Sequence, residues 1–537
     1  MTRSQHANRR LPAVRRQAGQ AMVLFMVLAG VLLLGVLLLF NTGQAVNKKV
    51  TLTNTADAAA YSVAVQQARV MNFAAYTNRA RIANEVAVAQ MVSLWSWMNM
   101  IHTHTVAGEN LFEYLSWIGP VRVIAKPLAM AYGAAEEVVG KLRDVAHPAL
   151  GGMIQLLDGI NGALALSAST LLTWGSAAGA VDIAIEVVEQ NDPTAEIAPI
   201  GLLVLGDQIA TAALSGGNNL LAHHVNSERN EGMDRYRNVV MASRDRFSAD
   251  RSDLLGIDIP LVKIGFEELG GTDLVDYDRW VAVDTLDLTV EIDLGLFDFE
   301  LDVPLGFGGA QAVTQENDQS FFPGIMSGEQ PGDPGWYSEY RPDPREFEQY
   351  NGATGTTAKH LAERYPSVNV PAHVPFFVPK RPSGKYNEKR HAYFAGYDGL
   401  RAYHDVNDSY GRRPEGSEAG PIFTVYVQSE RANARTSQDI DGIGGPNGSR
   451  LELDNRMSGD VMTAVATGQT YFNRPPDSPG GLFSRLIPDD WNGDLVHDGK
   501  LEQGSLFSPY WQARLVETPD EVYGLLQLSS LVTPGGG

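Results

Sequence analysis

The stretch that decides the fold is Gly19–Arg69, GQAMVLFMVLAGVLLLGVLLLFNTGQAVNKKVTLTNTADAAAYSVAVQQAR, which contains no proline. Its first part is apolar, whereas its second part is polar and rich in alanine. Residues Ala21–Phe40 carry no charge. At about 1.5 Å per residue they reach about 30 Å, which is the thickness of one hydrocarbon core. The sequence therefore predicts a transmembrane helix over residues 21–40 that continues beyond the membrane surface.

Charge predicts the orientation of this span. Residues 1–20 contain five arginines and no acidic residue, and Arg15 and Arg16 are the pair nearest the span. The positive-inside rule places this basic leader in the cytoplasm and everything after Asn41 outside it. The whole chain nevertheless has a net charge of −21. A body this acidic would repel phosphates, so we expect no nucleic-acid partner.

A cleavable secretory signal is the alternative to a retained anchor. The apolar segment is longer than a typical signal core, and Gly43-Gln44-Ala45 is a weak small-x-small cleavage site. We therefore expect a single-pass protein that stays in the membrane. The chain contains no cysteine, so an exported body has to be stable without disulfides and has no thiol chemistry.

Beyond the span, a long helix is predicted. No proline occurs from Gly43 to Val106, no glycine follows Gly43 in this range, and alanine is abundant. A heptad frame with Ala56 to Met98 at a and Ala59 to Ile101 at d makes eleven of fourteen positions apolar. A stretch with this apolar content would give nearly as many apolar heptad positions by chance. The pattern favours a helix that packs within its own domain over self-association through the long helix.

The rest of the chain divides into a helical and a β-rich part. Residues 107–247 have helical character, broken at 119–120, 147–152, 192–193 and 216–219. Strand-like alternation begins near Leu254, although a short helix is expected around Gly459–Thr467. We predict an α+β protein with a basic leader, a span, a helical membrane-proximal domain and a β-rich distal domain with proline/glycine-rich loops. Their ranges are 1–20, 21–40, 41–250 and 251–537.

The clearest local pattern is a β-hairpin around residues 286–303. Apolar residues alternate on both sides of Gly295-Leu296 and change parity across it, as a two-residue type II′ turn requires. Ile292 is then expected opposite Phe299, Asp293 opposite Asp298, and Glu291 opposite Glu300. Like charges directly opposed destabilise a sheet. Either this face is solvated and guards against edge aggregation, or it meets cations or a basic partner.

Motifs for chemistry are mostly missing. The sequence has no P-loop, no G-x-S-x-G elbow and no H-E-x-x-H helix. Asp490, Asn492 and Asp494 have the 1, 3, 5 spacing of a calcium loop, but Leu495 stands where an EF-hand needs glycine. An exposed turn is the simpler interpretation of this segment. We therefore expect no enzyme, no cofactor and no metal site beyond this weak calcium candidate.

The opening stretch resembles a known family. Arg15-Arg16, GQAMVLF, the apolar span, a short polar spacer and LTNTADAAAYSVAVQQAR are similar to the N-terminal segment of TadE/TadG-like Flp pilus-assembly proteins. The resemblance implies a bitopic, non-enzymatic inner-membrane component of a bacterial Flp (tight-adherence, type IVb) pilus. Its periplasmic body would contact other pilus-assembly or pilin-like subunits. Leu24 stands where processed pilins carry glutamate, so we expect a TadG-related protein whose leader stays attached.

One surface patch follows from this interpretation. Ala56, Ala58, Ala59 and Ala60 have small side chains that let another helix approach closely, just above the bilayer. Asp57 lies among them, either paired with a basic residue of a partner or simply solvated.

A membrane-tethered periplasmic hydrolase or ligand-binding receptor is the rival function. A deep pocket with converging carboxylates or histidines would favour this rival. An elongated body with an exposed apolar helix face would favour assembly.

Overall fold

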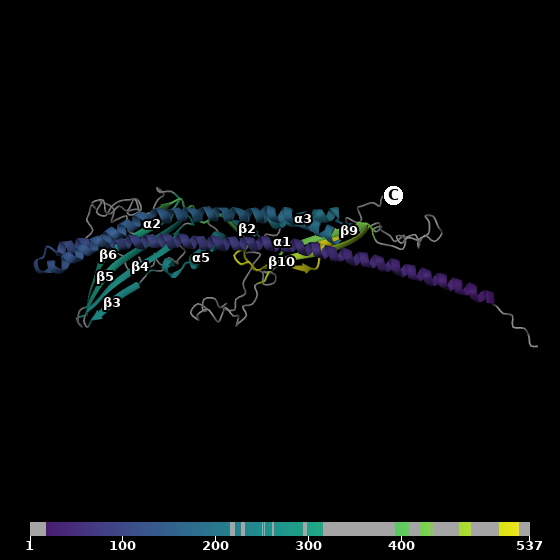
Figure 1. Cartoon of the computed structure of the whole chain (residues 1–537), viewed down its shortest axis with the longest axis horizontal. Helices are drawn as coiled ribbons and strands as arrows, with labels where there is room; N and C mark the ends of the chain where they lie inside the picture. Colours follow the sequence, from purple (N-terminus) through teal and green to yellow (C-terminus); the bar gives the residue numbers. More distant parts are fainter. Residues whose placement is uncertain are drawn as a thin grey trace, which may run out of the picture.

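The computed structural model describes thirteen stretches of the chain. They are residues 18–214, 221–226, 231–249, 251, 253–259, 262–275, 277–293, 298–314, 393–407, 419–430, 433, 461–473 and 504–525. The architecture is α+β, as the sequence predicts. All sheets and the other long helices are arranged along one helix, α1, which runs through the whole length of the molecule (Figure 1).

Helix α1 spans Ala18–Leu115, 98 residues without interruption. The predicted continuation of the span into a long helix is therefore confirmed, and the helix extends beyond the expected end at Val106. Its purple N-terminal part projects alone from the body (Figure 1). From Leu52 onward α1 becomes the central element of the body, with most of its apolar side chains buried.

A second long helix returns alongside α1. After a turn at η1 (Gly119–Val121), α2 (Arg122–Thr170) runs antiparallel to α1, and a short π-helical segment, η2 (Leu171–Gly175), joins it to α3 (Ser176–Asn191). Contacts fix the direction: Gly133 packs on Glu109 near the far end, and Gly179 lies near Gln66 close to the membrane end. The helices α1 and α2 therefore form an antiparallel pair.

The break expected at residues 147–152 is wrong, because α2 continues through Pro127 and Pro148. Proline has no N–H to donate to the carbonyl four residues earlier in a helix. For Pro148 that carbonyl belongs to Asp144, and both side chains are exposed, so this side of the helix faces solvent. Long-range packing of α2 on α1 outweighs the local propensity of the proline and of the two glycines that follow.

Smaller elements follow α3. Strand β1 (Ala195–Ile197), α4 (Pro199–Leu214), β2 (Leu221–His224), α5 (Glu231–Ala242) and α6 (Arg246–Ala249) lead to the first sheet. In this region residues 221–224 form a strand where the sequence suggested only helix. The reason is non-local, since β2 pairs with β8 (Tyr403–Val406), far away in the chain.

Within the described residues, the strands form three sheets. Strands β3 (Asp253–Ile259), β4 (Val262–Val275), β5 (Arg279–Asp293) and β6 (Asp298–Val313) form an antiparallel meander, to which β7 (Tyr393–Ala395) adds in parallel. The second sheet is the pair β2-β8. The third has the order β1-β9-β10-β11, with β9 at Ala419–Glu430, β10 at Val461–Phe472 and β11 at Trp511–Val516. The helix expected around 459–467 is thus wrong, because residues 461–467 belong to β10.

The sheets pack on α1 at successive levels. The β1-β9-β10-β11 sheet, α3 and α4 cover residues Leu52 to Ala64 of α1, nearest the span. Sheet β3–β7, α5 and α2 cover residues Ile82 to Met98 at the far end. The last strands of the chain therefore return to the membrane-proximal end. Both cores contain residues from before and after residue 250.

Candidate membrane-anchored interaction site

No other described segment of the chain covers the predicted span. Within α1 the apolar residues from Met22 to Leu33 are each more than half exposed, apart from the alanine and glycine among them. The most apolar window of the helix has a mean hydropathy of 3.1, and none of it is buried against the described chain. Exposing so many large apolar side chains to water is costly, whereas a bilayer would cover them. A second stretch, residues 119–173, also satisfies length and composition, at a mean hydropathy of 1.3.

Two groups of predicted site residues lie outside the described part of the chain. Arg15 and Arg16 belong to the leader, and Asp490, Asn492 and Asp494 belong to the weak calcium candidate. Their roles in orientation and in ion binding stay predictions.

Lys48 of α1, just beyond the span, forms an ion pair with the body. Its Nζ lies 2.6 Å from Oδ2 of Asp192 at the end of α3, and both side chains are largely buried. Burial alone would raise the pKa of Asp192, but hydrogen bonds from Lys48 and Thr194 outweigh it and hold that pKa below its ordinary value. Lys49 donates to the carbonyl of Thr463 in β10. The body is therefore attached at the base of the helix.

The alanine patch is divided between a buried and an open side. Ala56, Ala59 and Ala60 are completely buried in the core formed with α3, β9 and β10 of the same chain. A Cβ at Gly468 of β10 would overlap the carbonyl of Ala60, so the small side chains do permit a close approach. The element that approaches is this chain's own strand. A second subunit is left with the half-exposed Asp57 and Ala58.

The open side of α1 continues this patch away from the membrane. Tyr61, Phe73 and Tyr76 are exposed by 45%, 38% and 61%. Asp57 is one helical turn before Tyr61, and partial burial raises its pKa. Aromatic residues are enriched where proteins contact one another. Asp57, Ala58, Tyr61, Phe73 and Tyr76 are called the open face of α1 below.

The hairpin register is confirmed. Ile292 pairs with Phe299, Glu291 with Glu300, and Asp293 with Asp298, as the change of apolar parity predicts. The turn residues 294–297 are outside the described part. The opposed acidic positions are therefore real neighbours along β5 and β6, while the choice between a solvated face and a cation-binding face stays a prediction.

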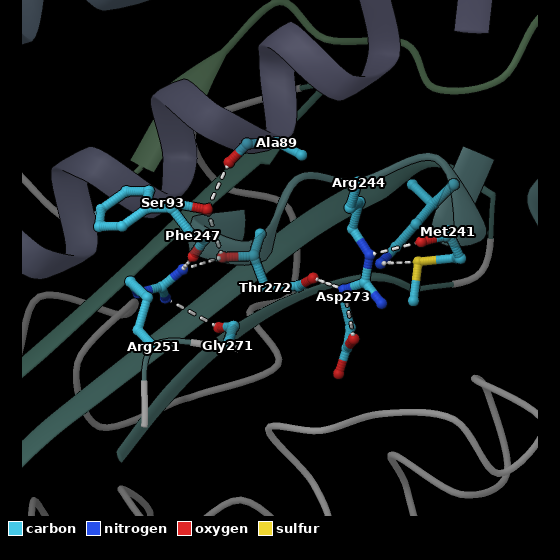
Figure 2. Close-up of polar contacts among 10 residues, drawn as sticks. Ala89, Ser93, Met241, Arg244, Phe247, Arg251, Gly271, Thr272 and Asp273 are labelled. Carbon is cyan, nitrogen blue, oxygen red and sulfur yellow. Dashed lines mark hydrogen bonds and ion pairs between the residues drawn. The ribbon is translucent and has the colours of Figure 1, made fainter. Parts of the chain in front are cut away.

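A buried polar cluster joins the β3–β7 sheet to α1, and Figure 2 shows its contacts among Arg251, Thr272 and Ser93. Arg251 donates to both carboxylate oxygens of Asp284, at 2.6 and 3.0 Å, and to the hydroxyl of Thr272 at 3.1 Å. The Thr272 hydroxyl lies 2.7 Å from that of Ser93, which donates to the carbonyl of Ala89 within α1. Arg251 and Asp284 are 2% and 0% exposed. The sheet is therefore positioned on α1 by directional contacts as well as by apolar packing.

A second buried cluster centres on Glu85 of α1. Its carboxylate accepts hydrogen bonds from Asn161 of α2 at 2.9 Å, from the Tyr397 hydroxyl at 2.7 Å and from the Trp280 indole at 3.3 Å. Burial raises the pKa of Glu85, and these hydrogen bonds together with nearby Arg81 oppose the shift. The cluster connects α1, α2 and the sheet. The sequence analysis did not predict this cluster. Asn84, a polar residue at an a position of the heptad frame, was a signal that could have indicated it.

Histidines meet on the β2-β8 pair. The rings of His223 and His404 stack with centroids 4.5 Å apart. Burial, together with His223, His224 and Arg81, lowers the pKa of His404 to about 4. This imidazole is neutral at pH 7. Among the residues that the structure describes, no three histidine or carboxylate side chains are grouped closely enough to hold a metal ion.

These features define a membrane-anchored α+β protein whose apolar N-terminal helix becomes the central helix of a folded body. The family model of Tad proteins, described as Flp pilus-assembly TadE/G-like, matches residues 19–67. The resemblance seen in the sequence is thereby confirmed over this segment, which is similar to TadE/TadG-like proteins. This supports involvement in Flp pilus assembly and, with it, contacts with other pilus components. No curated protein and no solved structure matches the chain.

Proposed function

We propose that the chain is a bitopic inner-membrane component of Flp pilus assembly that works through protein contacts and not through catalysis. In this proposal residues 1–20 are cytoplasmic and the body is periplasmic. One observation carries it: the segment matched by the pilus-assembly family is the base of α1, the same unbroken helix on which the whole body is built. The membrane anchor and the central helix of the body are thus one continuous helix.

The geometry suits a part that presents surfaces at a distance from the membrane. From Asn41 to Leu115, α1 rises by about 110 Å at about 1.5 Å per residue. The contact of Lys48 with Asp192 fixes the body to the helix at its base. A subunit bound anywhere along α1 would therefore be held at a defined height.

The elongated body with an exposed apolar helix face is the feature expected of an assembly protein. Figure 1 shows the elongation, and α2 exposes Val138, Leu142 and Val145 among other large apolar side chains. This observation favours assembly over the rival hydrolase or receptor, which is kept as the alternative function.

Topology is tested by labelling single cysteines, because the natural chain has none. A membrane-impermeant maleimide should label Gln190→Cys, an exposed position near the base of the body, in intact spheroplasts. Ser4→Cys in the leader should react only after the membrane is permeabilised. Labelling of both positions in intact spheroplasts, or of Ser4→Cys alone, would overturn the bitopic orientation.

Partner contact is tested by placing a photoreactive amino acid at Tyr61 on the open face of α1. We expect irradiation of intact cells to capture another pilus subunit, identified by mass spectrometry, because exposed aromatic residues at this height can insert into a partner. The same amino acid at Gln190, also exposed and near the membrane, is the matched control. Equal capture at the two positions, or capture of lipid alone at Tyr61, contradicts the proposal.

A further inference from the structure

The outer side of α2 carries a continuous exposed apolar seam. It follows heptad spacing over six consecutive heptads, and each of its residues is exposed in the folded body. The a positions are Leu128, Ala135, Leu142, Ala149, Leu156 and Ala163. The d positions are Ile124, Ala131, Val138, Val145, Gly152, Gly159 and Leu166. These thirteen residues, called the α2 seam, contain no polar side chain.

The α2 seam is distinct from the face that α2 uses within its own chain. Among the buried residues of α2, Ala129, Glu136 and Arg143 each come one position after a seam residue. One position is about 100° around a helix. The buried face includes polar side chains, whereas the exposed seam is entirely apolar and is not covered by α1. In Figure 1 α2 lies along one edge of the body, next to α1.

The glycines of α2 separate the two faces in the same way. Gly133 and Gly151, on the inner side, closely approach Glu109 and Phe394. At Gly152 and Gly159, in the seam, an added Cβ would meet no atom within 4 Å. Glycine inside a helix costs about 1 kcal/mol relative to alanine. The described fold does not require glycine at these two positions, nor at Gly162 outside the seam. In the seam, the small size of glycine would let a second helix approach closely.

The extent of the seam is sufficient for a stable pair. From Ile124 to Leu166 it runs about 64 Å, and a helix is about 10 Å wide. The strip covers about 640 Å² in projection on each helix, or about 1,300 Å² for two. Specific interfaces bury about 1,200–2,000 Å² in total. A contiguous exposed apolar strip of this size is larger than the patches that single soluble proteins usually leave open.

We infer that the α2 seam binds the α2 seam of a second copy of this chain as a parallel two-stranded coiled coil. A second copy supplies an identical, uncharged heptad seam of the same length. Parallel pairing rests on the proposed topology, since two copies anchored in one membrane hold α2 in the same direction. The lipid surface is a poor occupant, because α2 lies along α1, which leaves the bilayer as one unbroken helix.

Neighbouring cysteines provide the first test, in the full chain in native membranes. Val145→Cys lies in the seam, and Asp144→Cys is equally exposed but about 100° around the helix. Disulfides form only where Cα atoms approach within about 7 Å. With mild oxidant, Val145→Cys should give a covalent dimer and Asp144→Cys should give little. Equal yields from the two variants, or no dimer from Val145→Cys, would overturn the pairing.

Direction is tested at the ends of the seam. Val145 lies midway between Ile124 and Leu166, so Val145→Cys cross-links in either direction. Ile124→Cys and Leu166→Cys link to their own copies only if the helices are parallel. A dimer from Val145→Cys alone would show an antiparallel pair. The seam contact would then stand while the shared membrane orientation, and with it the proposed topology, would fail.

A charge in the seam gives an independent measure. Leu142→Glu, added to the Ile124→Cys variant, should reduce the cross-linked fraction by about tenfold or more, because two unpaired carboxylates would face each other in an apolar seam. Asp144→Asn in the same background should leave it unchanged. The Leu142 side chain is 57% exposed within one copy, so an unaltered protease-digestion pattern separates lost pairing from lost folding. A cross-link that survives Leu142→Glu contradicts the inference.

Discussion

Gly308→Ala is expected to detach the β3–β7 sheet from α1, with a loss of about 3 kcal/mol or more in the free energy of unfolding. A Cβ at Gly308 of β6 would overlap the carbonyl oxygen of Ser96 and lie 2.5 Å from the amide nitrogen of Met100. Both atoms belong to the backbone of α1 and cannot rotate away. Thermal unfolding of the detergent-solubilised chain, combined with limited proteolysis of residues 253–314, measures the effect.

Gly162→Ala, in α2 but outside the α2 seam, is the matched control for this change. It also places one methyl group on a glycine within a regular element, but no atom lies within 4 Å of the new Cβ. The expected result is unchanged or slightly raised stability, by up to about 1 kcal/mol, because alanine is the better helix former. Similar thermal shifts for both variants would show that the close approach of β6 to α1 does not hold the sheet.

Local patterns predicted the elements that depend on local properties. The span, the continuation of α1 and the register of the hairpin all follow from charge, composition or alternation within short windows. The fold of β10 does not. Its VMTAVATG segment combines two alanines and a methionine with two valines and two threonines, so local propensity does not decide between helix and strand. Pairing with β9 and the contact of Gly468 with Ala60 decide the outcome, and both partners are distant in the chain.

The same distinction applies to the candidate site. The small side chains of residues 56–60 predict close packing, but a sequence does not show that the chain's own β10 packs on them. The cluster around Glu85 draws its donors from positions 161, 280 and 397. No spacing rule relates such positions. The α2 seam, by contrast, has a heptad pattern, but only the structure shows that this side of α2 is exposed.

Asp284→Leu is expected to cost about 3–5 kcal/mol in the free energy of unfolding. The substitution leaves the buried guanidinium of Arg251 without its bidentate partner in β5, at a site where neither side chain is more than 2% exposed. Adding Arg251→Met to this variant should recover most of the loss, because an apolar pair needs no compensating charge. Chemical denaturation of the single and double variants, followed through sheet-specific protease resistance, gives the coupling.

An exposed ion pair provides the reference for the comparison of the Asp284 and Arg251 variants. Lys141 and Glu137 of α2 lie 2.7 Å apart, with side chains 74% and 67% exposed. Glu137→Gln should change stability by no more than about 0.5 kcal/mol, because water screens the pair. If Asp284→Leu has an effect as small as this, or if Arg251→Met adds to the loss instead of reversing it, Arg251 is not held in place by the carboxylate. Sheet β3–β7 would then be positioned on α1 by apolar packing and by the hydrogen bond between Ser93 and Thr272.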